Sequence, residues 1–287
     1  MNINLNNKTK GIICIISAAF CFACMNTFVR LAGDLPSIQK SFFRNLVALI
    51  FAAIMLMRTE EKFRFDKKNL PYLLIRAFFG TVGILGNFYA IDHLVLADAS
   101  MLNKLSPFFA IIFSYFILKE KVSLVQAAAV IIAFIGALFI IKPTGVTFNI
   151  ASLVGVLGGM GAGIAYTMVR VLSKRGERGP FIVFFFSAFS CLVTLPFLIF
   201  DFYPMAWWQV LSLLGAGLAA TGGQFSITAA YSFAPAKEIS VFDYTQIIFA
   251  ALLGFVLFAE LPDAYSILGY VIITLVSVGM FFVNKKK

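Results

Sequence analysis

Residues 81–120 of the chain read TVGILGNFYAIDHLVLADASMLNKLSPFFAIIFSYFILKE, and residues 221–260 read TGGQFSITAAYSFAPAKEISVFDYTQIIFAALLGFVLFAE. The two segments align at a constant shift of 140 residues. The matching positions are Thr81 with Thr221, Gly83 with Gly223, Ala90 with Ala230, Ser100 with Ser240, Phe109 with Phe249, Ala110 with Ala250, and Glu120 with Glu260. Nearer the N-terminus the shift is 144, which aligns Gly11 with Gly155 and Pro36 with Pro180. This constant register predicts that the chain consists of two similar halves.

The composition places most of the chain in lipid. Of its 287 residues, 61% are hydrophobic and 13% are charged, and the mean hydropathy is +0.95. A soluble domain carries about 25% charged residues and under about 50% apolar ones. These values argue against a soluble enzyme, a disordered protein and a secreted disulfide scaffold. The four cysteines all lie within apolar runs, which indicates small membrane-buried residues rather than a redox or metal site.

A helix needs about 20 apolar residues to cross the hydrocarbon core of a bilayer. The apolar runs predict ten spans, at about residues 11–32, 37–57, 70–91, 97–118, 123–142, 151–174, 180–200, 207–232, 239–259 and 264–284. Turn sequences such as Gly33-Asp34-Leu35-Pro36 and Arg178-Gly179-Pro180 separate them. The longest polar connection runs from Arg58 to Asn69, so no loop is large enough to hold another domain.

The basic residues between the spans predict the orientation of the chain. Lys and Arg together number 23 against 13 Asp and Glu, which gives a net charge of +10. With a cytoplasmic N-terminus, 17 basic residues fall at cytoplasmic span ends, counting Arg76, and only Arg30, Lys40 and Lys142 fall at the opposite ends. We expect Arg30 and Arg76 to reach the membrane surfaces by snorkelling. The bias predicts a multi-pass plasma-membrane protein with both termini in the cytoplasm, and it explains the positive charge without a nucleic-acid partner.

Each half has five spans, and because five is odd the second half lies upside down relative to the first. The sequence therefore predicts an all-α integral membrane protein with ten transmembrane helices. These form two inverted five-helix repeats, at residues 11–142 and 151–284. Inverted repeats are common in alternating-access transporters, whose substrate site lies near the bilayer midplane between the halves.

The chain resembles the EamA-type branch of the drug/metabolite transporter superfamily over essentially its whole length, as two EamA-like repeats. The residues that carry the resemblance are Ala99-Ser100, Ser106-Pro107 and Leu118-Lys119-Glu120, then Ala236, Ser240, Phe242-Asp243-Tyr244-Thr245-Gln246 and Phe258-Ala259-Glu260. The family has an apolar residue and often Gly before that Glu, and Lys119 and Ala259 depart mildly from this pattern. The resemblance implies a secondary transporter with a central cavity lined by spans one, three, four, six, eight and nine. It implies no particular substrate.

Ionisable residues within the spans mark a cavity or a buried partner, because a charge in lipid is costly. Lys104 has no acid at a similar depth, so we expect it either to titrate or to receive an anion. The alternative is a structural hydrogen bond to carbonyl groups. Arg170 and Asp243 fall at matching depths in the cytoplasmic half. They either pair with each other or bind the substrate or a proton directly. Lys104, Arg170 and Arg44 outnumber Asp243, which favours an anionic substrate.

Neutral polar residues recur at equivalent places of the two halves, where a midplane site is expected. With Lys104, Arg170 and Asp243, the predicted substrate-binding residues are Asn26, Asn87, Tyr89, Asn103, Tyr166, Gln224, Tyr244 and Gln246. Any single one of them fits an interhelical hydrogen bond equally well. Glycines cluster at 80–86, 155–163 and 215–223, which predicts close helix packing rather than phosphate binding. We expect His93, the only histidine, at the surface.

The sequence contains no HExxH, GxSxG, Walker A or Cys/His cluster motif. This argues against an enzyme, a catalytic residue, a metal, a cofactor and a primary pump. We predict a secondary active transporter that exports or exchanges a small polar metabolite, with an amino acid or organic acid favoured. Its expected partners are that metabolite, membrane lipids and the proton as candidate coupling ion. The alternative is a non-transporting protein such as a lipid scramblase, which would carry a polar stripe open to lipid.

Overall fold

The computed structural model of the protein describes residues 6–119, 123–141, 150–234, 239 and 242–285. Every regular element in these residues is a helix, as predicted. The helices are α1 (Asn7–Leu31), α2 (Ser37–Met57), the 3₁₀ turn η1 (Lys67–Asn69), α3 (Leu70–His93), α4 (Leu96–Asn103), α5 (Ser106–Leu118), α6 (Leu124–Ile141), α7 (Ile150–Lys174), α8 (Gly179–Phe200), α9 (Trp207–Phe233), α11 (Thr245–Phe258) and α12 (Ala264–Lys285). Some residues used in the sequence alignment and charge count lie outside the described ones, namely Glu120, Lys121, Lys142, Ala236, Lys237, Ser240, Lys286 and Lys287.

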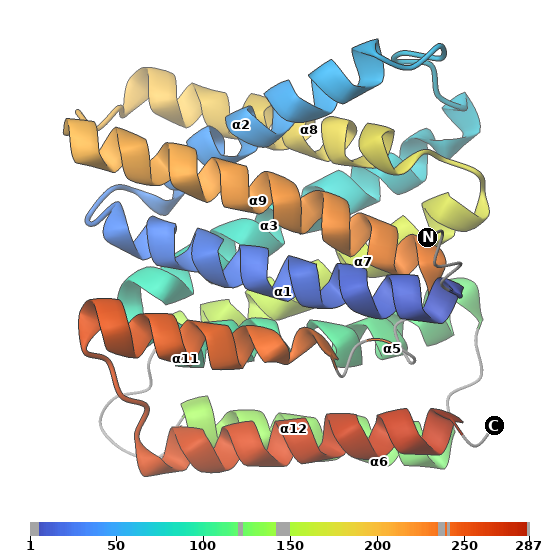
Figure 1. Ribbon diagram of the computed structural model, residues 1–287, viewed down its shortest axis with the longest axis vertical. Coiled ribbons are helices and arrows are strands. Elements are labelled where there is room, and N and C mark those ends of the chain that lie inside the picture. The colour runs from blue at the N-terminus through green and yellow to red at the C-terminus, as the bar shows by residue number, and fades with distance from the viewer. Residues whose placement is uncertain (1–5, 120–122, 142–149, 235–238, 240–241, 286–287) are drawn as a thin grey trace, which may run out of the picture.

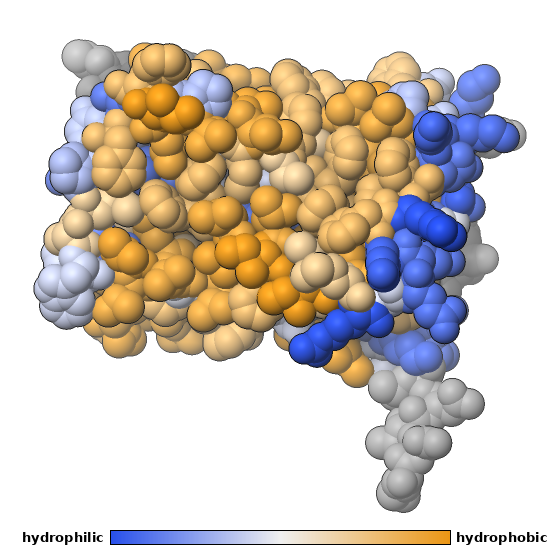
Figure 2. Space-filling view, turned by 90° about the horizontal axis from the view of Figure 1, so that it is seen from above, coloured by the Kyte–Doolittle hydropathy of each residue, from blue (hydrophilic) through white to orange (hydrophobic). Residues whose placement is uncertain are grey.

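The described helices account for the ten predicted spans. Seven segments are long and apolar enough to cross a membrane, and α4 and α5 together form one of them, Leu96–Leu118. Three shorter apolar stretches, Ala127–Ile140, Thr245–Phe258 and Ala264–Val276, supply the rest. A broad apolar band covers the middle of the molecule, and hydrophilic side chains gather at one end (Figure 2). That end also holds the N- and C-termini, so we call it the termini end and the opposite one the far end (Figure 1).

Local sequence signals set the helix boundaries. The Asn6 side chain accepts a hydrogen bond of 2.8 Å from Thr9 N, which caps α1 about one turn before the predicted start. Proline stands in the first turn of α3, α5 and α8, where its missing N–H is not needed. The turns after α1 and α7 contain Gly33 and Gly176, whose φ values of 67° and 81° suit glycine.

The fourth and ninth spans are broken in the same way. The fourth is interrupted at Lys104, which follows the last residue of α4, and the ninth turns at Tyr244 before α11 begins. Both spans then end in a left-handed residue, Lys119 with φ 52° and Ala259 with φ 53°. Lys104 and Tyr244 are 140 residues apart, as are Lys119 and Ala259, which is the shift of the sequence alignment. The repeat is therefore visible in the backbone as well as in the residue types.

The main helix contacts join the two halves, and they are equivalent when the two halves are interchanged. α1 packs mainly on α9, and α3 packs mainly on α7. A two-fold rotation that interchanges α1 with α7 and α3 with α9 turns the α1–α9 contact into the α7–α3 contact. α2 packs on α8, and α6 packs on α12 beside the rest of the bundle, as such a rotation requires (Figure 1). The two five-helix halves are thus inverted copies joined along a shared interface.

Glycines bring α3 and α7 into backbone contact, as the glycine clusters predicted. A Cβ atom on Gly83 would lie 3.0 Å from Ala162 N, and one on Gly86 would lie 2.9 Å from Val154 O. The contact is reciprocal, since a Cβ on Gly158 would lie 3.0 Å from Asn87 N and 3.1 Å from Gly83 O. A side chain at any of these positions meets backbone, which cannot turn away.

This packing generates a stability prediction. We expect Gly158→Ala to lower the free energy of unfolding by about 1–3 kcal/mol, because it overpacks a backbone contact. Gly279→Ala in α12 is the matched control, since a Cβ there meets nothing within 4 Å. Thermal unfolding of the purified protein in detergent measures both. Equal stability of the two variants would contradict the proposed packing role of Gly158.

Candidate functional site

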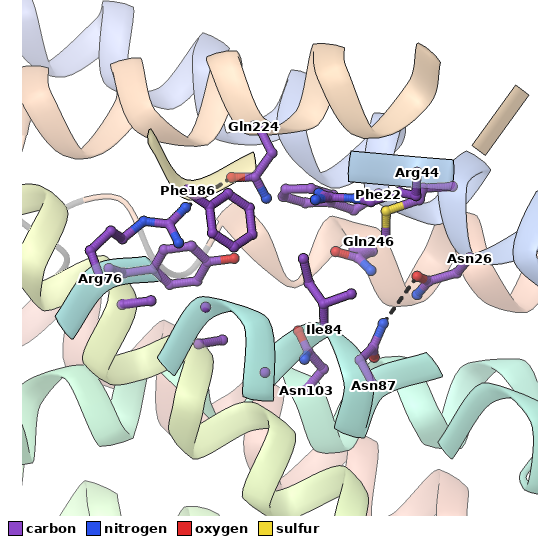
Figure 3. A pocket seen from close by; sticks show the side chains of 16 residues that line it. Phe22, Asn26, Arg44, Arg76, Ile84, Asn87, Asn103, Phe186, Gln224 and Gln246 are labelled. Carbon is purple, nitrogen blue, oxygen red and sulfur yellow. Dashed lines mark hydrogen bonds between the residues drawn. The ribbon is translucent and has the colours of Figure 1, made fainter. Parts of the chain in front are cut away.

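A narrow cavity lies between the two halves (Figure 3). Side chains of α1, α2, α3, α7, α8 and α9 line it, together with Asn103 at the end of α4 and Gln246 in the first turn of α11. The volume of the cavity is about 50 Å³. One water molecule needs about 10–15 Å³ of such volume. The cavity in this conformation has room for only a few water molecules, so it must widen to admit a metabolite. Spans two and seven, which the family resemblance did not imply, contribute Arg44 and Phe186.

Arg44 enters the cavity from α2. It lies seven residues after Ser37, which is about 10 Å from the far end at about 1.5 Å per residue. Its side chain is fully buried. Nη1 donates a hydrogen bond to Asn45 Oδ1, whereas Nε and Nη2 have no partner among the described residues. Arg44 therefore brings a positive charge and two unpaired donor atoms deep into the membrane.

Arg76 enters from α3, on the other side of Phe186 in the view of Figure 3. Its Nη2 donates to Gln224 Oε1 at 3.0 Å, and its guanidinium carbon lies 4.1 Å from the centre of the Phe186 ring, a cation–π contact. Gly80 leaves room for this side chain, since a Cβ there would collide with Nη1. The expectation that Arg76 snorkels to the surface is wrong. Its side chain is only 2% exposed because an aromatic face and an amide oxygen hold it inside.

No acid balances these two arginines. Among the described residues, neither Arg44 nor Arg76 forms an ion pair, and no Asp or Glu lines the cavity. A buried charge without a counter-charge is unfavourable in the low-dielectric interior of a membrane protein. The cavity is therefore electropositive, and an anion is the ligand that would offset the cost of burying both guanidinium groups. Arg76 was not in the predicted site, although a charged residue six positions into a span was the signal that could have identified it.

Six of the predicted site residues line this cavity. They are Asn26, Asn87, Asn103, Tyr166, Gln224 and Gln246. Asn87 Nδ2 donates to Asn26 Oδ1 at 3.2 Å (Figure 3). Asn26 Nδ2 donates in turn to Ser100 Oγ at 3.3 Å, so a chain of hydrogen bonds links α3, α1 and α4. The Tyr166 ring stacks on that of Tyr231, with centroids 5.2 Å apart. The sequence thus identified the neutral part of the cavity wall.

Lys104 and Asp243 lie outside the cavity wall and pair with each other. Lys104 Nζ is 2.7 Å from Asp243 Oδ1, and the two side chains are only 4% and 1% exposed. The Tyr244 hydroxyl donates to the backbone oxygen of Lys104 at 2.9 Å. The prediction that Lys104 has no acidic partner is wrong, because depth was counted along unbroken helices. Both residues stand at the breaks of the fourth and ninth spans, which bring them together.

Arg170 also differs from the prediction. Its Nη1 donates to Tyr231 O at 3.2 Å and Ser232 O at 3.4 Å, two carbonyls in the last turn of α9. It does not pair with Asp243, whose ion-pair partner is Lys104. This contact recurs in the other half, where Arg30 Nη1 donates to Ile91 O at the end of α3. Arg30 also pairs with Glu260, so it does not snorkel freely as expected.

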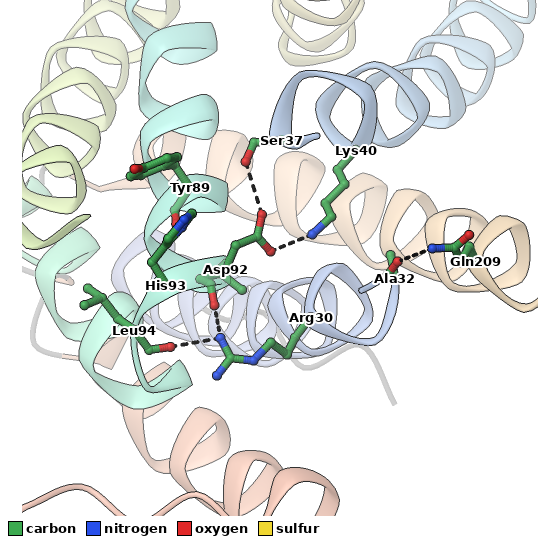
Figure 4. A network of polar contacts seen from close by, with 10 residues as sticks. Arg30, Ala32, Ser37, Lys40, Tyr89, Asp92, His93, Leu94 and Gln209 are labelled. Carbon is green, nitrogen blue, oxygen red and sulfur yellow. Dashed lines mark hydrogen bonds and ion pairs between the residues drawn. The ribbon is translucent and has the colours of Figure 1, made fainter. Parts of the chain in front are cut away.

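Tyr89 does not line the central cavity. It lies beside His93 in the last turns of α3 (Figure 4). Its ring stacks on His93, with centroids 4.2 Å apart, and both side chains are exposed. The surface position expected for His93 is confirmed. Nearby, Asp92 accepts from Lys40 Nζ at 2.5 Å and from Ser37 Oγ at 3.1 Å, which ties α3 to α2 (Figure 4).

The described residues contain no group of three or more His, Cys, Asp or Glu side chains that could hold a metal ion. Cys14, Cys21, Cys24 and Cys191 are unpaired thiols within helices, as the sequence suggested. The cavity wall offers arginine and amide groups as binding elements.

Comparison with known proteins connects this geometry to a family. The EamA-like transporter family matches the chain twice, over residues 9–142 and 150–282. A pseudopaline exporter of Pseudomonas aeruginosa is 33% identical over 274 residues, which cover 94% of this chain and 95% of the relative. A riboflavin transporter of Vibrio cholerae is 27% identical over 277 residues, covering 94% and 92%. A solved crystal structure, 15% identical, covers 97% of this chain and 98% of its own with a TM-score of 0.69, which shows the fold alone.

The Lys104–Asp243 pair generates a second stability prediction. Lys104→Met or Asp243→Asn alone leaves one buried charge unpaired, so we expect each to lower the free energy of unfolding by about 3–5 kcal/mol. The double variant leaves no charge and should be more stable than either single variant. Unfolding of purified protein in detergent measures this coupling.

Arg170→Gln supplies the control for this comparison of single and double variants. Because Arg170 binds carbonyl groups of α9, its effect should add to that of Asp243→Asn. Additive losses in the Lys104/Asp243 double variant, or strong coupling between Arg170 and Asp243, would contradict the pairing.

Proposed function

Because the chain belongs to the EamA-like transporter family, we propose that it is a secondary active transporter for a small metabolite that carries a carboxylate, such as an amino or organic acid. One observation carries this proposal. Two fully buried arginines face a cavity between the inverted halves, and no acid in the described cavity wall balances them. A substrate carboxylate fits the planar donor groups of arginine, which bind such anions through two parallel hydrogen bonds. In this proposal the predicted cavity residues Asn26, Asn87, Asn103, Tyr166, Gln224 and Gln246 complete the site.

Contacts between the halves at both ends of the bundle support alternating access. At the far end, Glu260 of the second half pairs with Arg30 and accepts from Leu96 N at 2.9 Å. At the termini end, Glu177 of the second half accepts from Asn69 Nδ2 at 3.0 Å. Arg178 adds contacts with Glu61 and Thr59 of the first half at the termini end. Both sets consist of polar contacts, so one set can break while the other remains. We infer that opening one set at a time exposes the cavity to alternate sides as the halves 11–142 and 151–284 move against each other.

Export is the direction we propose, as in the name of the relative from Pseudomonas aeruginosa, and exchange against a second metabolite uses the same site. Lipid scrambling, the alternative raised by the sequence, needs a polar path that faces lipid. The polar side chains described above are instead buried between helices: Arg44, Asn87 and Gln224 are each less than a tenth exposed. This burial supports transport of a soluble molecule over scrambling.

Transport by the purified protein in proteoliposomes tests the proposal. Vesicles are loaded with a mixture of amino and organic acids, pseudopaline and riboflavin, and efflux is followed by mass spectrometry. We expect efflux of at least one carboxylate, reduced at least tenfold by Arg44→Gln or Arg76→Gln, because a hydrogen bond to a charged group contributes about 1.5–3 kcal/mol. Arg58→Gln, at an exposed position after α2, is the matched control and should leave efflux unchanged.

The same vesicles test the proton as coupling ion. We propose Asp243 as its carrier, since its carboxylate is buried and lies 2.7 Å from Lys104 Nζ. A pH gradient should then accelerate efflux by the wild-type protein but not by Asp243→Asn. Absence of efflux of any compound would contradict the transport proposal, and equal efflux by the Arg44, Arg76 and Arg58 variants would contradict the proposed site.

The orientation in the plasma membrane is also a proposal, and it rests on the distribution of basic residues. With Arg76 inside the cavity, the bias is still 16 cytoplasmic basic residues against 3. We expect a tag placed after Lys287 to be inaccessible in intact cells and a tag at the exposed Asp201 to be accessible. Labelling with an impermeant reagent measures both, and labelling of the C-terminal tag from outside would overturn the orientation.

A further inference from the structure

The unpaired polar atoms of the central cavity are of two opposite kinds. Hydrogen-bond donors without a partner are Arg44 Nε, Arg44 Nη2 and Arg76 Nε. Hydrogen-bond acceptors without a partner are Asn87 Oδ1 and Gln246 Oε1. All four side chains line the cavity and are at most 7% exposed. Buried polar atoms are nearly always paired in folded proteins, so this set indicates the hydrogen-bonding pattern of a ligand.

The donors require more than one anionic group. The guanidinium carbons of Arg76 and Arg44 lie 4.1 and 5.8 Å from the centre of the same Phe186 ring, so they are within about 10 Å of each other. They come from different helices and have different neutral partners, Gln224 and Asn45. A ligand with one carboxylate neutralises one arginine and leaves the other buried and unpaired. A ligand with two carboxylates on a short chain neutralises both.

The acceptors require a nitrogen that carries hydrogen. The Asn87 amide nitrogen is already used, since it donates to Asn26, whose own nitrogen donates to Ser100. This chain leaves the Asn87 oxygen for a donor from the ligand. Gln246 lies in the first turn of α11, on the second half, and offers a second oxygen across the cavity. An ammonium or secondary amine bridges such oxygens, whereas a carboxylate is repelled by them.

We propose that the substrate is an amino dicarboxylate. One anionic group binds Arg44, the other binds Arg76, and a protonated nitrogen between them donates to Asn87 and Gln246. The Phe186 ring, already in contact with both guanidinium groups, fixes the two arginines at the spacing that the ligand must match. This inference rests on the proposed transport function and specifies its substrate class.

Binding of a compound series to the purified protein in nanodiscs tests the inference. The series varies the spacing of the two carboxylates, with aspartate, glutamate, 2-aminoadipate and 2-aminopimelate. Each is compared with its side-chain amide, which has one carboxylate, and with the matching dicarboxylate that lacks the amine. We expect the best amino dicarboxylate to bind at least tenfold more tightly than both of its partners. Equal binding of all three would overturn the inference.

Variants assign each preference to its residues. Arg44→Gln and Arg76→Gln should each reduce the preference for the dicarboxylate over its amide to less than threefold. Gln246→Met keeps the shape of the side chain and should reduce only the preference for the amine. Arg58→Gln should change neither ratio. Since each readout is a ratio measured on one sample, a partly unfolded variant does not imitate the result, and unchanged ratios in the arginine variants would contradict the assignment.

The outcomes separate this inference from the proposed function. If a monocarboxylate is transported and no amino dicarboxylate binds better than its partners, the substrate class is wrong and the transport proposal stands. If none of the compounds, including pseudopaline and riboflavin, is bound or transported, both are overturned. Tight binding of an amino dicarboxylate with transport of the same compound supports both.

Discussion

Arg44 and Arg76 carry two positive charges into the bundle, and no acidic residue in the described part of the chain pairs with either. An arginine stays charged in a protein, so its charge must be compensated by its surroundings. The Phe186 ring and the Gln224 oxygen provide part of this compensation for Arg76, and Gly80 provides the room. The rest of the two positive charges is not compensated by any acid among the described residues. The site is therefore electrostatically incomplete without an anion, and this is the physical basis for selecting a substrate.

In contrast to the two arginines, the buried charge of Lys104 is compensated within the protein, by Asp243. The pair is as deeply buried as the arginines, but its charges cancel at 2.7 Å. It also joins the break of the fourth span to that of the ninth, one from each half. A pair of this kind ties the two half-helices together, and it is sensitive to loss of either charge. The protein thus has one balanced ion pair, whose Asp243 is also the proposed proton carrier, and two uncompensated arginines that face the ligand cavity.

Much of the fold followed from residue patterns because the bilayer imposes strong rules. Span length, the bias of basic residues and the 140-residue register predicted ten spans in two inverted halves, and the left-handed residues Lys119 and Ala259 repeat at that register. Six of the eight neutral polar residues predicted for the site line the cavity, since a polar group inside a span has few places to face. Glycine clusters predicted the close contact of α3 with α7 for the same kind of reason.

The ionisable residues were harder to predict, because their long side chains and the breaks in their helices defeat depth counting. Lys104 reaches an acid assigned to the opposite half of the membrane, and Arg170 turns to carbonyl groups of α9 instead of Asp243. Arg76 stays inside where snorkelling was expected. Tyr89 lies beside His93 at the far end, because counting along α3 does not show which face is buried. The errors at Lys104, Arg170 and Arg76 concern contacts between distant segments, which local sequence does not encode.

A structure of the protein with a bound amino dicarboxylate tests the central claim most directly. The account predicts density for the ligand between Arg44 and Arg76, with one carboxylate on each guanidinium group and the nitrogen toward Asn87 and Gln246. It also predicts a cavity wider than the present one. A ligand bound elsewhere, with both arginines still without an anionic partner, would contradict the account.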